Sequence, residues 1–114
     1  MKFLNLGSIV HLKDDEKNIK LMIISYLPRV NENGKEGYYD YAGCLYPFGL
    51  IEDKAFFFNE EDIDEVLEGG YSDEDGKEFI QSLNDNYENI KLPKLKHVDK
   101  SYGKDDEDLS DLLD

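Results

Sequence analysis

Cys44 with His11 or His97 is the combination in this chain that could supply a nucleophile and a base. An imidazole can activate a neighbouring thiol for covalent catalysis. However, Cys44 stands between Gly43 and Leu45 in an apolar stretch, where a lone cysteine is usually a small buried hydrophobe. Because no third side chain is evident that would orient the base, the sequence predicts no catalytic site, and we expect a protein that is not an enzyme.

Metal and phosphate ligands also lack the spacing that their sites require. Two histidines and one cysteine do not form a zinc pattern. The acidic loop 70–76 is the best calcium candidate, but counting back from Gly76 places Tyr71, not an aspartate, at the first ligand position. Neither Gly7-Ser8 nor Gly69-Gly70 is followed by the Gly-Lys-Ser/Thr of a phosphate loop. We therefore expect no metal and no bound cofactor.

Aromatic side chains are the more informative group, and most of them lie in residues 38–48 and 56–58. Alternate residues of a strand face opposite sides of its sheet, so one set of rings must form the core. The second set is either covered by helices or exposed to a partner. If exposed, the protein-binding surface would include Tyr39, Tyr41, Tyr46, Phe48, Phe57, Asp62 and Tyr71.

Four segments of the N-terminal half have the composition of β-strands, namely residues 8–13, 20–27, 38–45 and 53–58. Residues 20–27 are apolar on both faces, which indicates an inner strand, and Pro28 ends it. The step Asn33-Gly34 favours a tight hairpin turn. This half is therefore predicted to be an antiparallel meander of about four strands.

Two short helices are expected after this sheet. Asn59 is a good N-cap, and Ile63, Val66 and Leu67 have the i, i+3, i+4 spacing of one apolar helical stripe, which Gly69-Gly70 would end. A second helix is expected from about residue 73 to 87, after a capping box that begins at Ser72. The predicted fold class is α+β, with a small antiparallel sheet of about four strands, two short α-helices and an acidic, flexible C-terminal tail.

The predicted domain boundary lies near residue 90. Residues 1–90 would form the α+β domain, and residues 91–114 a linker and an acidic tail. If the tail folds as a helix, Leu109, Leu112 and Leu113 form one apolar stripe that could dock into a partner's groove. The alternative is a frayed terminus that only aids solubility.

The charge of the chain constrains its partners. It has 27 acidic and 13 basic residues and a net charge of −14, so nucleic acid and anionic membrane surfaces are disfavoured. Basic protein surfaces are favoured, although the charge can also serve solubility alone. The single cysteine, the lack of a membrane-spanning run and the lack of a signal peptide together predict a cytoplasmic protein without membrane insertion.

The sequence also resembles a known family over about residues 4 to 83. The likeness rests on residues 6–12 (LGSIVHL), 21–24 (LMII), 39–49 (YDYAGCLYPFG) and 57–63 (FFNEEDI), with EGGY at 68–71. These segments resemble the domain of unknown function 4176 family, which comprises small proteins of Gram-positive bacteria. The tail lies outside the likeness.

The resemblance implies a role in type VII secretion. Members of the family are found in type VII secretion gene clusters, close to LXG-type toxins and their small helical partners. The resemblance therefore implies an adaptor or chaperone that binds such a toxin or its complex for export. The alternative is an immunity protein that neutralises a toxin domain. No catalytic residue or cofactor comes with the family.

Overall fold

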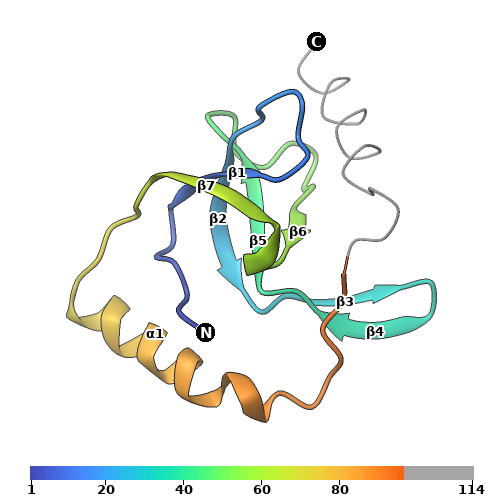
Figure 1. Cartoon of the computed structure of the whole chain (residues 1–114), viewed down its shortest axis with the longest axis vertical. Helices are drawn as coiled ribbons and strands as arrows, with labels where there is room; N and C mark the ends of the chain where they lie inside the picture. The colour runs from blue at the N-terminus through green and yellow to red at the C-terminus, as the bar shows by residue number, and fades with distance from the viewer. Residues whose placement is uncertain (97–114) are drawn as a thin grey trace.

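Two apolar strands form the centre of the main sheet (Figure 1). The computed structural model describes residues 1–96, and in it β2 (Leu21–Tyr26) pairs antiparallel with β5 (Tyr41–Leu45). Burial alternates along the first half of β2, whereas every residue of β5 is buried. The strand predicted to be an inner one is therefore an inner strand.

Five strands make up this sheet, in the order β6-β5-β2-β1-β7, and all neighbours are antiparallel. Its edge strands are β6 (Phe56–Phe58) and β7 (Ile63–Glu68), and β1 (Ile9–Leu12) lies between β2 and β7. A separate hairpin consists of β3 (Arg29–Glu32) and β4 (Lys35–Tyr38). Its turn is the predicted Asn33-Gly34 step, where both residues have positive φ, as the favoured two-residue turn requires.

The main sheet is curled because its two edge strands are close neighbours in the chain. Only residues 59–62 join β6 to β7, and Glu60–Asp62 form the 3-10 turn η1. A flat five-stranded sheet would separate its edges by about 19 Å, whereas such a connection reaches only about 13 Å. The sheet must therefore bend so that its edges approach each other.

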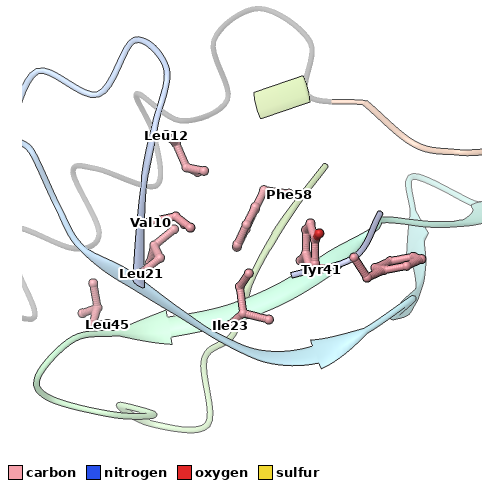
Figure 2. Packing of buried hydrophobic residues seen from close by; sticks show 8 residues of the cluster. Val10, Leu12, Leu21, Ile23, Tyr41, Leu45 and Phe58 are labelled. Carbon is pink, nitrogen blue, oxygen red and sulfur yellow. The ribbon is translucent and has the colours of Figure 1, made fainter. Parts of the chain in front are cut away.

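The core lies on the inner face of this curved sheet (Figure 2). Four strands contribute to it, and their labelled side chains point toward one common space. The labelled residues are Val10, Leu12, Leu21, Ile23, Tyr41, Leu45 and Phe58. Phe3 joins the same cluster, and its ring contacts Tyr26, Tyr41 and Tyr87 edge-on.

One helix, α1 (Glu74–Asn86), follows the sheet and continues into the 3-10 turn η2 (Tyr87–Asn89). Asp73 is its N-cap and accepts a hydrogen bond from the backbone N–H of Gly76 at 2.9 Å, so the cap is one residue later than Ser72. Ile80 and Leu83 pack against the core cluster, and Asn84 accepts a bond from the N–H of Phe3. The N-terminal segment thus runs between α1 and the sheet (Figure 1).

The predicted fold class is wrong. Residues 1–96 form a β-rich fold with seven strands in two sheets and one α-helix, not four strands followed by two helices. The first predicted helix is only the turn η1, after which the chain extends as β7. Pairing with β1 places Leu12 beside Ile63 and Val10 beside Val66, and these ladder bonds determine the local conformation despite the helical spacing of the apolar residues.

Residues 93–95 also pack on the domain. Lys94 forms a parallel bridge with Tyr38, whose carbonyl accepts the N–H of Leu95 at 2.8 Å. A Cβ on Gly37 would lie 2.6 Å from the Cγ of Leu95, so glycine is required for this close approach. We expected a linker to begin at residue 91. In the structure, residues 93–95 instead contact β4 through backbone hydrogen bonds.

Among residues 1–96, no helix has the length and apolarity that crossing a bilayer requires.

Candidate protein-binding surface

Cys44 is buried in the middle of the sheet. It lies opposite Met22 on β2, and burial raises the pKa of its thiol, which disfavours the reactive thiolate. His11 pairs with β7 instead, where its Nδ1 lies 3.9 Å from Oε1 of Glu65. His97 is outside the described residues. The structure therefore gives Cys44 no activated environment.

His11 and the acidic residues form no metal site in the described part of the chain. Nε2 of His11 is buried without a hydrogen-bond partner, although the side chain as a whole is 19% exposed. Within residues 1–96, no group of three or more His, Cys, Asp and Glu side chains is arranged to hold a metal ion.

A buried carboxylate, Asp40, lies at the junction of the hairpin and the main sheet. Its side chain has no solvent exposure, and it accepts the hydroxyl of Tyr87 at 2.7 Å and the backbone N–H of Glu60 at 2.9 Å. Nζ of Lys94 lies 3.0 Å from its Oδ2. The charge is thus balanced by a cation and by two hydrogen-bond donors, as a buried carboxylate requires.

Asn59 extends this cluster toward the C-terminal segment. Its buried side chain accepts the N–H of Asp40 at 2.9 Å and donates to the carbonyl of Leu95 at 2.7 Å. Its own N–H donates to the carboxylate of Asp62, which closes the η1 turn. The predicted N-cap Asn59 therefore caps a 3-10 turn and also holds Leu95.

Lys94 is the cation of the cluster. Burial alone would lower its pKa, but hydrogen bonds to Glu61 and Asp40 outweigh burial and raise the pKa above its ordinary value. Burial would raise the pKa of Glu61, yet the bond from Lys94 makes the net change a decrease. The pKa of Tyr87 is raised by burial and by its bond to Asp40. We name these five residues the Asp40 cluster: Asp40, Asn59, Glu61, Tyr87 and Lys94.

The Asp40 cluster is built for structure, because its buried polar groups have partners within the chain. It joins β5, η1, η2 and the C-terminal segment. Such a closed network fixes a unique arrangement and leaves no buried donor or acceptor for a substrate. Residues 58–62 (FNEED) and 39–41 (YDY), which belong to the motifs singled out in the sequence, thus lie together in space. Their polar side chains hold the fold together.

Several residues expected at a binding surface belong to the interior. Tyr39 and Tyr41 are buried, and Phe57 is half-buried with its ring stacked 5.9 Å from that of Tyr39. The hydroxyl of Tyr41 accepts the N–H of Leu4 at 3.0 Å. Asp62 caps η1, and its carbonyl accepts the N–H of Lys13. These residues therefore shape the fold beneath the surface.

Other predicted residues do lie outside. Tyr46 and Phe48 are 44% and 59% exposed on the loop after β5, and Leu50 beside them is 53% exposed. The loop is tight, since Gly49 has φ +84° and its N–H donates to the carbonyl of Leu45. We name Tyr46, Phe48 and Leu50 the apolar turn. Sequence reasoning missed Leu50, although its spacing of two from Phe48 repeats that between Tyr46 and Phe48.

A second exposed region involves β7. Tyr71, which was predicted, is exposed just after this strand, and Val66 and Leu67 are exposed within it. Val66 and Leu67 were assigned to the apolar stripe of a short helix, so their exposure on a strand was missed. Leu6 and Phe79 are likewise exposed and were not predicted.

A groove of about 280 Å³ runs along β7. The N-terminal segment contributes Lys2 and Leu4, whereas β7 and the turn before it contribute acidic and apolar groups. We name it the β7 groove; its other lining residues are Tyr41, Glu60, Ile63, Asp64 and Val66. The groove is lined by both apolar side chains and carboxylates, a combination that suits a polypeptide better than a small charged metabolite.

The leucines of the predicted tail stripe, Leu109, Leu112 and Leu113, lie outside the described residues.

Comparison with known proteins identifies a family. The family model described as Domain of unknown function (DUF4176) matches residues 3–79, which contain all seven strands and the first half of α1. Neither a curated protein nor a solved structure matches the chain. Since the match covers more than half of its length, the chain belongs to the DUF4176 family.

Proposed function

We propose that this protein is a cytoplasmic adaptor or chaperone that binds an LXG-type toxin, or the toxin with its helical targeting partners, for export by a type VII secretion system. The observation that supports binding most directly is the apolar turn, where three large apolar side chains are about half exposed within five residues. Contiguous apolar side chains at the surface of a small protein are typical of interaction sites. The link to secretion is what the family resemblance implies, since members of the family are found in type VII secretion gene clusters.

Charge and composition support the same function. The net charge of −14 accelerates encounter with a basic partner surface. Aromatic residues such as Tyr46 and Phe48 contribute strongly when they enter a partner's pocket, and truncating one central ring can cost about 2 kcal/mol or more of binding free energy.

Co-purification with an LXG toxin from the same organism tests the proposal. Wild-type protein should bind the toxin, and Phe48→Ala should weaken binding about 30-fold. Phe79→Ala is a matched control, because Phe79 is 55% exposed but lies on α1. No co-purification by the wild type, together with unchanged toxin secretion after gene deletion, would refute the proposed function.

The excess of acidic residues also favours a second function, neutralisation of a basic toxin domain by an immunity protein. The two functions differ in the part of the toxin that is bound. An adaptor should retain the N-terminal LXG half, whereas an immunity protein should retain the C-terminal toxic domain and protect cells that express it.

A further inference from the structure

Strand β7 is an open edge of the main sheet. Within residues 1–96, its only strand partner is β1, and five of its six residues are exposed. The other edge strand, β6, has only three residues and ends in the buried Phe58. A strand edge presents backbone donors and acceptors that another extended chain can use, so β7 is the edge with the length for added pairing.

The surroundings of this edge suit an added strand. The β7 groove lies beside it and offers Leu4, Ile63 and Val66 as apolar contacts. Val66 and Leu67 are 44% and 37% exposed, which leaves apolar area to be covered. The backbone around the C-terminal end of β7 is held firmly, because Gly70 packs against the carbonyl of Leu6 and its N–H donates to Ser8.

The charges of β7 decide what kind of strand it accepts. Along the strand, Asp64, Glu65 and Glu68 are acidic, whereas Ile63, Val66 and Leu67 are apolar. In a symmetric antiparallel pair with a second copy of β7, Asp64, Glu65 and Glu68 would each lie opposite an apolar residue, so none of these carboxylates would gain a cationic partner across the pair. Lys2 is the one basic residue that lines the groove. Charge complementarity therefore selects a basic partner.

We propose that the outer edge of β7 binds an extended segment of a partner protein by antiparallel strand addition. The complementary segment has basic residues opposite Asp64, Glu65 and Glu68, and apolar residues opposite Ile63, Val66 and Leu67. Read in its own direction, its pattern is basic, apolar, apolar, basic, basic, apolar. The inference rests on the proposed function insofar as the partner is the exported toxin or its targeting complex.

A peptide titration tests the pairing without the toxin. The probe is a blocked peptide with the core Lys-Val-Val-Lys-Lys-Val, and its charge-reversed control has the core Glu-Val-Val-Glu-Glu-Val. With the full-length ¹⁵N-labelled protein, the lysine peptide should slow amide hydrogen exchange within residues 64–68 and shift the amides of Leu4 and Val66. The glutamate peptide should do neither.

A charge-swapped variant provides the specificity test. In Asp64→Lys/Glu68→Lys both changed residues are exposed, so the fold should persist. The lysine peptide should bind this variant about tenfold more weakly or worse, and the glutamate peptide should now bind. Shifts scattered over the acidic surface without slowed exchange in β7 would overturn the proposal, because they would indicate only general charge attraction.

Toxin co-purification then separates the two proposals. If the wild type and the charge-swapped variant bind the toxin equally well, the partner does not use β7, and this inference fails while the proposed function stands. If the wild type does not bind the toxin but the peptide is held at β7, the identity of the partner in the proposed function is wrong and the pairing edge remains. Loss of toxin binding in the folded variant supports both.

Discussion

Lys94 Nζ lies 3.0 Å from Oδ2 of Asp40, and this contact ties the last described segment of the chain to the residue that precedes β5. The same carboxylate accepts the Tyr87 hydroxyl and the N–H of Glu60. One buried side chain therefore joins segments that are separated by up to 54 positions in the sequence.

The first prediction concerns this carboxylate. Asp40→Ala should lower the free energy of unfolding by about 3–5 kcal/mol, because it removes one partner of a buried ion pair and leaves the Tyr87 hydroxyl and the N–H of Glu60 unpaired. Urea unfolding followed by tyrosine fluorescence measures the change. Glu36→Gln, at an exposed position of β4, is the control and should change stability by no more than about 0.5 kcal/mol. Equal stability of the two variants would contradict the structural role of the Asp40 cluster.

The second prediction concerns alkaline pH. Burial raises the pKa of Tyr41 from 10.0 to about 12. Below pH 10 the phenol is protonated in both folded and unfolded chains, so its contribution to stability is constant there. Between pH 10 and 12 only the unfolded chain loses the proton, so stability should fall by about 2–3 kcal/mol as the pH rises.

Denaturant midpoints measured from pH 9 to 12 test this dependence. Tyr41→Phe should show a shallower loss over this range, although it should be about 1 kcal/mol less stable at pH 7, where Leu4 loses its hydrogen-bond acceptor. Burial also raises the pKa of Tyr26 and Tyr87, so part of the slope should remain. An unchanged slope in Tyr41→Phe would show that its phenol does not contribute.

The third prediction compares two adjacent glycines. A Cβ on Gly70 would lie 1.9 Å from the carbonyl oxygen of Leu6, whereas a Cβ on Gly69 would meet nothing within 4 Å. Gly70→Ala should therefore destabilise the fold by about 1–3 kcal/mol through backbone displacement. Gly69→Ala should leave stability unchanged or slightly higher. Thermal unfolding of the two variants distinguishes them, and similar midpoints would mean that the end of β7 is not held against Leu6.

The fourth prediction orders three phenylalanines. Phe58 is fully buried and should cost about 3–5 kcal/mol on truncation to alanine. The half-buried Phe57 should cost less, and the exposed Phe48 should cost about 0.5 kcal/mol or less. Chemical denaturation of the three variants gives the order directly. Equal losses would contradict the assignment of Phe48 to an exposed binding surface.

Local patterns predicted part of this fold. The apolar residues of β1, β2 and β5, the Asn33-Gly34 turn and the helix after residue 73 all follow from short-range composition. The segment after Asn59 did not, because Ile63, Val66 and Leu67 fit a helical stripe, and the pairing that extends them involves β1, more than 50 residues earlier. A prediction from the spacing of apolar residues within one segment cannot include a contact with a segment so far away in the sequence.

The candidate site was predictable to a similar extent. Alternation shows that two neighbouring rings face opposite sides of a strand, but it does not show which side is covered. Tyr39 and Tyr41 were candidates for an exposed surface, yet both are buried, whereas Tyr46 and Phe48 are exposed. Lys94 was assigned to a linker, because no local feature reveals that its ammonium group faces Asp40.

The Asp40 cluster also sets an order of events during synthesis of the protein. A ribosome makes Asp40 long before Lys94 and Leu95, so the nascent chain contains a carboxylate whose counter-charge does not yet exist. Until those residues emerge, this carboxylate must stay hydrated, and β5 cannot be sealed at that end. The Asp40 cluster can therefore close only after Lys94 and Leu95 have been made.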